Sequence, residues 1–527
     1  MPTVHVEVEK KYVADEGFEL PPLTELVAGT DAGRDASVTP VAEGESVRQR
    51  LSATYFDTAD LRLAMAGLTL RCRTGGDDAG WHLKAPAGVD ARSEVRVPLG
   101  PGGRTVPAPL QQMVWAHSKG GSLRPVAEIV TDRTVRRLVD VTGRVLAELA
   151  DDRVTARRLL PTGGMGDAAG APMSWREIEI EVELGEGDVE LLSAVDARLR
   201  ERGLQEAPSA SKLAQVLDLQ GSARTASRKA KMTVTSPGGQ VLLAHVREQV
   251  HQVLAQDLPV RLDAPDSIHK MRVATRRLRS ALTTFKPLFA ADVVGPLSAE
   301  LKWWAGELGA ARDAEVMRDR VSKAVEGEAN VVELTPVAAV ADVELGQAYR
   351  NARDRVLTEL DGERYHALLA ALDGLITTPP WTERAEAAAG TTLPRLVARS
   401  YTGVRRLVKE AGHTPAGADR EELLHDARKA AKRARYAGEA VSGVFGEDAA
   451  AFAEAMEGVQ EALGEHQDSV LTRERLQDLA LHTTSTSAAF LYGRLHAMEE
   501  ARAQKSQRHF DAAWKAAGRK SLHRWLR

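Results

Sequence analysis

Residues 5–12 read His5-Val6-Glu7-Val8-Glu9-Lys10-Lys11-Tyr12, and this stretch decides the fold of the N-terminal part of the chain. Polar and apolar residues alternate along it with a period of two, which is the period of an extended strand. Glu7, Glu9 and Lys11 therefore share one strand face, and the opposite face is mostly apolar. The stretch predicts a β-strand with one charged face.

The same alternation of charged residues around a bulky apolar residue returns at Arg71-Cys72-Arg73, His82-Leu83-Lys84, Glu94-Val95-Arg96 and Glu179-Ile180-Glu181-Val182-Glu183. Strands of this kind can close into a barrel with a charged lumen. A lumen lined by both signs is unfavourable unless it holds an ion and a counter-ion. Carboxylates would take a hard divalent cation and the Arg/Lys set a polyanion, so a metal-bound triphosphate satisfies both.

Together these motifs resemble the CYTH domains, the triphosphate tunnel metalloenzymes, which include thiamine triphosphatases, inorganic triphosphatases and class IV adenylyl cyclases. Glu7-Val8-Glu9-Lys10-Lys11 matches the ExExK signature of that family. Besides the charged strands above, the resemblance runs in family order through Tyr55-Phe56-Asp57-Thr58, Trp81-His82-Leu83-Lys84, Arg92-Ser93-Glu94 and Ser211-Lys212-Leu213. It implies an antiparallel β-barrel tunnel with flanking helices over residues 1–220.

The resemblance also implies roles for the charged residues of the tunnel. The carboxylates expected to hold Mg²⁺ or Mn²⁺ are Glu7, Glu9, Asp152, Glu179, Glu181 and Glu183. The residues expected to bind the substrate are Arg71, Arg73, Lys84, Glu94, Arg133, Arg137 and Lys212. Lys11 would complete the phosphate cage or orient the attacking water. Glu183 either belongs to the metal set or extends the strand, because the ExExE run leaves its pairing open by two residues.

Residues 221–236 are rich in small and polar residues and are expected to form a linker, after which the residue pattern of the sequence changes. Residues 237–527 show helical periodicity and an internal repeat. The first copy carries His269, Arg272, Arg276 and Arg279, and the second carries His425, Arg428, Lys432 and Arg435 at the same spacing. Each copy is followed by a Leu-Gly-x-x-x-Asp element, which ends at Asp313 or Asp468. We expect an all-α bundle with internal duplication.

At 100° per residue, the four basic positions of each copy form one stripe along a helix. Two pseudo-symmetric stripes in one bundle can face a shared groove, where they would hold a long, evenly charged polyanion. This half resembles the CHAD domain, a helical domain named for its histidines and often fused behind CYTH. The ligand implied by that resemblance is inorganic polyphosphate, and all eight stripe residues are candidates to bind it.

Composition narrows the possible classes of protein. The net charge of −4 argues against a protein that binds nucleic acid over its whole surface, so no specific nucleic-acid partner is expected. The single cysteine, Cys72, excludes an intramolecular disulfide and a Cys-rich zinc site. The sequence shows neither a signal-peptide pattern nor a run of about 18 apolar residues, which predicts a cytoplasmic protein without a membrane anchor.

Three functions compete at this point. The first is a metal-dependent triphosphatase acting on inorganic triphosphate, because no aromatic-rich stretch suited to stacking a base or thiazolium lies beside the motifs. The second is an adenylyl cyclase that uses the same tunnel, which requires an adenine pocket and a base near the ribose hydroxyl. The third is a non-catalytic scaffold that binds polyphosphate, against which the intact acidic and basic sets argue.

Overall fold

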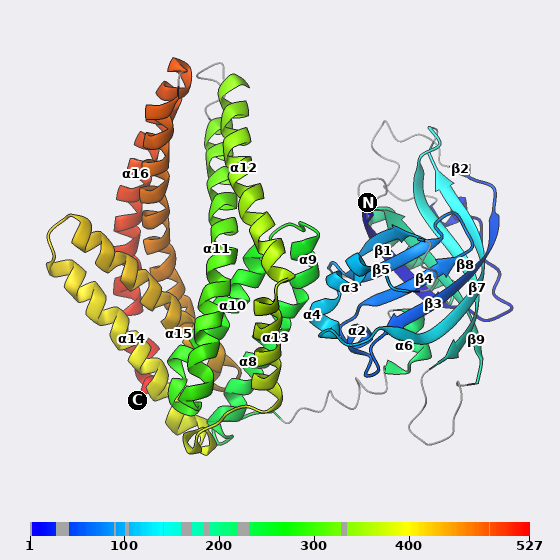
Figure 1. The fold of residues 1–527 in the computed structure, drawn as a ribbon, viewed down its shortest axis with the longest axis horizontal. Coiled ribbons are helices and arrows are strands. Elements are labelled where there is room, and N and C mark those ends of the chain that lie inside the picture. The colour runs from blue at the N-terminus through cyan, green and yellow to red at the C-terminus, as the bar shows by residue number, and fades with distance from the viewer. Residues whose placement is uncertain are drawn as a thin grey trace. The chain divides into compact units, whose positions relative to one another are not determined.

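The computed structural model describes residues 3–27, 42–88, 91–100, 105–140, 142–159, 171–183, 189–209, 211–219, 231–327, 335–483 and 485–527. The chain divides into two compact units, Met1–Lys229 and Ala230–Arg527. The first is a β-barrel with flanking helices and the second is helical (Figure 1), which confirms the predicted fold class. Most of the expected linker, residues 221–230, lies outside the described residues.

Eight of the described strands close the barrel in the order β1-β6-β5-β4-β3-β7-β8-β9, and β9 pairs back to β1. All these pairings are antiparallel. The strands are β1 (Thr3–Val13), β3 (Val47–Asp57), β4 (Thr69–Thr74), β5 (Gly80–Pro86), β6 (Ala91–Pro98), β7 (Arg124–Val139), β8 (Val145–Arg158) and β9 (Met173–Glu183). Short strands β2 (Ala42–Glu43) and β10 (Gln205–Glu206) add to β7 and β1.

The apolar side of the barrel strands packs on helices outside the barrel. α1 (Leu23–Val27) contacts β7 and α5 (Val189–Glu201) contacts β9, and Tyr12 and Ile180 share a core there with Leu192 and Leu199. Short helices α2 (Arg62–Met65), α3 (Ala108–Met113) and α4 (Trp115–Ser118) lie between strands in the sequence. The alternation read in the sequence therefore separates a helix-covered outside from a charged inside.

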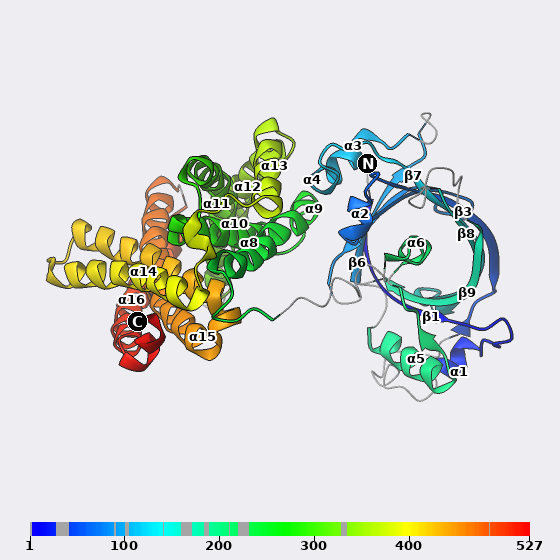
Figure 2. The same ribbon diagram turned by 90° about the horizontal axis from the view of Figure 1, so that it is seen from below.

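One helix lies within the ring of strands. Figure 2 looks along the barrel and shows α6 (Lys212–Val216) inside it. Leu213 and Val216 of α6 pack against Ile129 and Val154 of the wall, and all four side chains are buried. α6 thus fills one end of the barrel and carries Lys212 into the lumen.

The second unit consists of long helices. They are α8 (Gly238–Ala255), α9 (Asp257–Arg261), α10 (Ser267–Thr284), α11 (Ala291–Gly327), α12 (Thr335–Leu360), α13 (Glu363–Thr377), α14 (Ala389–His413), α15 (Ala418–His482) and α16 (Thr486–Ala517). Within α15, Gly446 has non-helical dihedrals (φ 57°, ψ −137°), so α15 is two helices joined at a kink. None of the helices that the structure describes is long and apolar enough to cross a bilayer.

The kink explains how the sequence repeat appears in the fold. The first copy of the repeat lies on α10 and continues on α11, whereas the second lies before and after Gly446 within α15. Arg272 of α10 lies 3.2 Å from Asp313 of α11, and Arg428 lies 3.6 Å from Asp468 across the kink. The Leu-Gly-x-x-x-Asp element therefore supplies the acid that pairs with the first arginine of each stripe.

Candidate functional site

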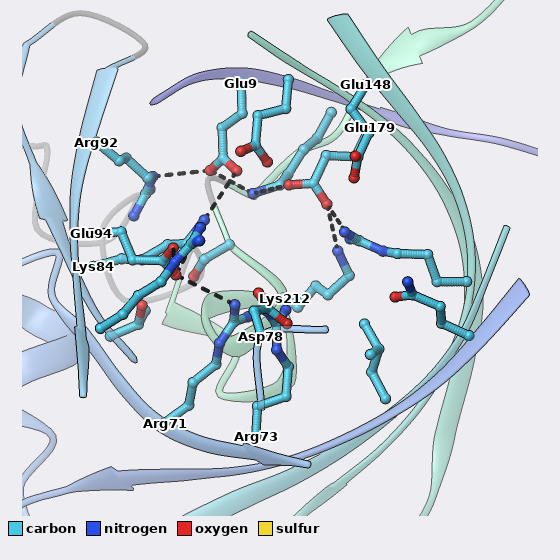
Figure 3. A pocket seen from close by; sticks show the side chains of 18 of the residues that line it. Glu9, Arg71, Arg73, Asp78, Lys84, Arg92, Glu94, Glu148, Glu179 and Lys212 are labelled. Carbon is cyan, nitrogen blue, oxygen red and sulfur yellow. Dashed lines mark hydrogen bonds and ion pairs between the residues drawn. The ribbon is translucent and has the colours of Figure 1, made fainter. Parts of the chain in front are cut away.

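The barrel encloses a charged cavity of about 320 Å³. Nine basic side chains line it: Lys11, Arg71, Arg73, Lys84, Arg92, Arg96, Arg133, Arg137 and Lys212. Seven acidic side chains line it as well: Glu9, Asp77, Asp78, Glu94, Glu148, Glu179 and Glu181. Figure 3 labels ten of these side chains, among them Glu9, Glu179 and Arg71, which point into the cavity. A cavity with this lining is a site for a polyanion accompanied by cations.

Barrel closure brings three carboxylates together. β1 and β9 pair so that Glu9 lies opposite Glu181 and Lys11 opposite Glu179. Glu9, Glu179 and Glu181 can each offer an oxygen within 4.8 Å of the others. The ammonium group of Lys11 lies 2.7 Å from Glu9 and 3.4 Å from Glu179. One oxygen of Glu9, Oε2, is buried and accepts no hydrogen bond from the described residues.

Next to this cluster lies a second one, formed by Asp152, Glu177 and Glu179. Arg133 donates two hydrogen bonds of 2.8 Å to Asp152 and one of 2.9 Å to Glu179. Lys212 lies 2.8–3.1 Å from all three carboxylates. Two side-chain cations thus pair with the three carboxylates of the second cluster, and Asp152 lies with Arg133 and Lys212 rather than with Glu9.

These contacts determine the charge states of the buried groups. Burial by itself raises the pKa of Glu179, but Lys11, Lys212 and Arg133 hold that pKa well below its usual range. Burial by itself lowers the pKa of Lys212, and the carboxylates of Glu177, Glu179 and Asp152 hold it well above its usual value. Glu179 is therefore ionised and Lys212 is protonated at neutral pH.

The opposite wall carries Arg71 and Arg73 of β4 with Lys84 of β5 and Glu94 of β6. Glu94 is almost fully buried and lies 3.7 Å from Arg71 and 3.9 Å from Lys84. Burial by itself raises the pKa of Glu94, but His82, Lys84 and Arg71 hold it far below its usual range. Glu94 is an anion that holds the basic side chains of this wall in place.

Arg73 is buried on this wall close to the other cations of the cavity. Burial and the nearby charges of Arg71 and Arg133 lower the pKa of Arg73 to about 9. Its Nε is buried without a hydrogen-bond partner among the described residues. A buried guanidinium among other cations is stabilised by an anion that accepts two parallel hydrogen bonds from it.

The structure brings most of the predicted tunnel residues together. Lys11, Glu9, Glu179, Glu181, Arg71, Arg73, Lys84, Glu94, Arg133, Arg137 and Lys212 line the cavity. Arg137 pairs with Glu148 at 2.9 Å. The side chains of Glu7 and Glu183 lie outside the described part of the chain, although their backbones pair with one another.

Several residues of the site escaped the sequence prediction. Arg92 lies 3.2 Å from Glu9, and Arg96 donates a 2.6 Å hydrogen bond to Glu94. Both share a strand face with Glu94, so the alternation of residues along β6 could have predicted that they line the cavity. Glu177 shares the face of Glu179 in the same way. The hydroxyl of Tyr55 accepts a hydrogen bond of 3.4 Å from Arg71. In the sequence, only the Tyr55-Phe56-Asp57-Thr58 motif pointed to this residue.

In the helical unit, α10 and α15 pack together around a basic groove of about 200 Å³. Its basic lining is Arg276 and Arg279 from the first stripe and Lys429, Lys432 and Arg433 from α15. Burial and the charges of Arg276, Arg428 and Arg272 lower the pKa of Lys432 to about 7. Cations from both copies of the repeat are thus close enough to repel one another.

The remaining stripe residues lie elsewhere. Arg272 and Arg428 pair with aspartates, and neither His269 nor His425 lines the groove. Burial and the nearby charge of Arg312 lower the pKa of His269. Burial and the nearby charge of Lys429 lower the pKa of His425. Arg435 lies 2.7 Å from both Glu439 and Glu457, so its charge is neutralised. Arg433 lines the groove instead; it belongs to the sequence repeat, at the position of Arg277, but was not among the predicted polyphosphate-binding residues.

Comparison with known sequences agrees with this geometry. Residues 41–217 match the CYTH domain family and residues 244–477 the CHAD domain family. Uncharacterized protein Rv2226 of Mycobacterium tuberculosis H37Rv is 36% identical over 521 residues, which are 97% of this chain and 96% of that protein. Uncharacterized protein MT2285 of strain CDC 1551 matches to the same extent.

Among solved structures, PptA from Streptomyces chartreusis has 22% identity and a TM-score of 0.45, covering 53% of this chain and 100% of that one. The CHAD domain from the plant Ricinus communis has 22% identity and a TM-score of 0.43, covering 55% and 96%. A putative adenylyl cyclase from Hippeastrum, described as having a dominant triphosphatase activity, has 16% identity and a TM-score of 0.23, covering 41% and 95%.

The CYTH match begins after β1, but β1 completes the barrel between β6 and β9 and carries Glu9 and Lys11 into the cavity. The two family matches follow one another along the chain, and the Mycobacterium proteins align over nearly all of it. The chain therefore belongs to the proteins that join a CYTH domain to a C-terminal CHAD domain.

Proposed function

We propose that the barrel hydrolyses inorganic triphosphate with the help of Mg²⁺ or Mn²⁺, and that the helical unit binds inorganic polyphosphate. The observation that carries the first part is the division of the cavity into an acidic cluster, Glu9, Glu179 and Glu181, and a basic wall that includes Arg71, Arg73 and Lys84. A metal-bound triphosphate needs both groups at once.

The acidic cluster fits a hard divalent cation. Its three carboxylates are close enough to share one ion, and the buried Oε2 of Glu9 has no hydrogen-bond partner among the described residues. Carboxylate oxygens are the ligands that Mg²⁺ and Mn²⁺ prefer. When bound, such an ion would neutralise phosphate charge and lower the pKa of a bound water. Glu9, Glu179 and Glu181 form our metal set, while Asp152 orients Arg133 and Lys212.

The protein's own residues account for the rest of the reaction. Arg71, Arg73 and Lys84 would bind phosphoryl oxygens, and planar guanidinium groups can do so through two hydrogen bonds. Arg133 and Lys212, fixed by the second acidic cluster, would stabilise the charge that develops on the transferred phosphoryl group. Lys11 holds Glu9 and Glu179 in place, and the apolar side chains of α6 pack against the barrel wall beside Lys212.

The lining of the cavity favours an inorganic substrate over a nucleotide. Among the described residues that line it, Tyr55 is the only aromatic, and it contacts Arg71. A cyclase would need a surface for adenine and a base beside the ribose hydroxyl. The test is phosphate release from inorganic triphosphate, ATP and thiamine triphosphate, with cyclic AMP measured in parallel. We expect the highest kcat/KM with inorganic triphosphate and no cyclic AMP, and cyclic AMP production would overturn the proposal.

Support for polyphosphate binding comes from the groove between α10 and α15. Arg276, Arg279, Lys432 and Arg433 face it without an acid to pair with among the described residues, and the pKa of Lys432 is lowered by burial and by its cationic neighbours. A row of like charges costs free energy unless an anion occupies it. Titration of the full-length protein with long-chain polyphosphate at low and high salt tests this, and a lack of binding at low salt would contradict it.

A further inference from the structure

The turn that joins β4 to β5 brings two acids into the basic part of the cavity. It consists of residues 75–79, and Gly75 and Gly76 have positive φ angles of 83° and 73°. A Cβ on Gly75 would lie 2.1 Å from the carbonyl oxygen of Arg50, and one on Gly76 would lie 2.8 Å from the side chain of Leu51. Leu51 itself lines the cavity, so the two glycines let the turn fold against the inner wall of β3.

Asp78 is held in this turn at two points. Its carboxylate forms an ion pair with Arg73, and its carbonyl oxygen accepts a 2.9 Å hydrogen bond from Nε2 of His82. His82 is almost fully buried, and its other ring nitrogen lies 3.0 Å from Glu94. Figure 3 shows Asp78 between Arg71, Arg73 and Lys212, inside the cavity.

The carboxylate of Asp78, paired with Arg73, resembles a phosphate group of the substrate that the tunnel would bind. Carboxylate and phosphate present the same pair of oxygen acceptors to a guanidinium fork. Arg73 is buried beside the cations Arg71 and Arg133, so it needs an anion whether or not substrate is present. Asp78 supplies that anion from within the chain, and it does so at the high effective concentration of a tethered group.

We propose that Asp78 is an internal competitor for the phosphate-binding Arg73, which substrate must displace on entry and which helps to displace product afterwards. This inference rests on the proposed triphosphatase function of the tunnel. Displacement of Asp78 would require rotation of its side chain, because the hydrogen bond from His82 to its carbonyl oxygen holds the backbone of the turn. Loss of the Asp78 carboxylate should therefore tighten the binding of phosphate anions and slow the loss of product.

The neighbouring acid, Asp77, offers a matched control. It lines the same cavity and is exposed, and no ion pair joins it to a basic side chain within the described residues. The Asp77→Asn and Asp78→Asn variants remove the same charge from the same turn, but only Asp78→Asn removes the ion pair with Arg73. Calorimetric titration with sodium tripolyphosphate in EDTA compares them under conditions in which a metal-dependent reaction cannot proceed.

We expect Asp78→Asn to tighten tripolyphosphate binding about fivefold, and Asp77→Asn to change it about twofold or less because its charge is screened. In an Arg73→Gln background the Asp78→Asn effect should vanish, because its partner is gone. In assays with Mg²⁺, Asp78→Asn should lower KM and strengthen inhibition by pyrophosphate.

Equal effects of the two Asn variants, weaker binding in Asp78→Asn, or an unchanged effect of Asp78→Asn in the Arg73→Gln background would each overturn the inference while leaving the triphosphatase proposal intact. Failure of the wild-type protein both to bind tripolyphosphate in EDTA and to hydrolyse it with Mg²⁺ or Mn²⁺ would overturn both. Thermal unfolding of each variant checks that the barrel is folded, and Asp78→Ser provides a second substitution for the same comparison.

Discussion

The ammonium group of Lys11 lies 2.7 Å from the carboxylate of Glu9, its neighbour two residues earlier on the same strand face. The last two charged residues of the ExExK signature thus form an ion pair inside the barrel. Arg92 lies 3.2 Å from the same Glu9 oxygen, whereas Oε2 of Glu9 has no hydrogen-bond partner among the described residues. Lys11 and Arg92 therefore orient one oxygen of Glu9, and the other, Oε2, lies 3.8 Å from the ammonium group of Lys84 without a hydrogen bond.

The first prediction concerns this oxygen. Glu9→Gln removes a metal carboxylate from a polar cavity rather than from a packed core, so turnover of triphosphate should fall about 10²-fold or more while the melting temperature changes little. Initial rates at saturating Mg²⁺ or Mn²⁺ measure this. Glu128→Gln is the control, because Glu128 is bonded to Arg157 on the exposed side of the barrel. A near-native rate in Glu9→Gln would remove Glu9 from the metal set.

The second prediction concerns the two walls of the helical groove. Arg276→Glu with Arg279→Glu changes the wall from α10, and Lys432→Glu with Arg433→Glu changes the wall from α15. Because one groove needs both walls, each double variant of the full-length protein should abolish polyphosphate binding at moderate salt. Binding that is only halved by each pair would instead indicate two separate sites.

Arg435 provides the control for this experiment. Since Glu439 and Glu457 already neutralise it, Arg435→Gln should leave polyphosphate affinity within about twofold of wild type, as expected for a charge outside the groove. A large loss of affinity in Arg435→Gln would support the prediction from the sequence that Arg435 binds the ligand.

The third prediction is a pH dependence of polyphosphate binding that arises from Lys432. Burial and the cations Arg276, Arg428 and Arg272 lower its pKa to about 7, while Asp468 acts in the opposite direction. A bound polyanion favours the protonated amine, so affinity should be steady below about pH 7 and fall as the pH rises above it. Binding isotherms from pH 6 to 9 measure this, and Lys432→Arg should flatten the profile because arginine stays charged. An unchanged slope in Lys432→Arg would assign the effect to another group.

The fourth prediction concerns stability. Asp57, fully buried at the end of β3, accepts hydrogen bonds from the backbone N–H groups of Thr58, Leu63 and Ala64 at 2.6–2.9 Å. Asp57→Ala leaves those donors unpaired and should cost about 2–4 kcal/mol of unfolding free energy. Asp57→Asn should cost less because it keeps an acceptor. Denaturant unfolding measures both, and equal stability of Asp57→Ala and wild type would contradict this role.

The sequence by itself determined the strand faces and the repeat. Alternation with a period of two decides which side chains point inward, since neighbouring residues of a strand face opposite sides. Glu9, Lys11, Arg71 and Arg73 were therefore predictable as lumen residues. The spacing of the repeat likewise predicted that Arg276 and Lys432 would occupy equivalent helix positions, because that spacing reflects local helical geometry.

Which of these residues contact one another became clear only from the tertiary structure. Glu9 reaches Glu181 because β1 pairs with β9, two strands separated by most of the barrel sequence. Asp152 forms ion pairs with Arg133 and Lys212. Arg435 forms an ion pair with Glu457, whereas Arg433 lines the groove. Asp78 reaches Arg73 through a glycine turn that no periodicity describes. Periodicity reports the direction of a side chain, whereas its partner depends on strand register and helix packing between distant parts of the chain.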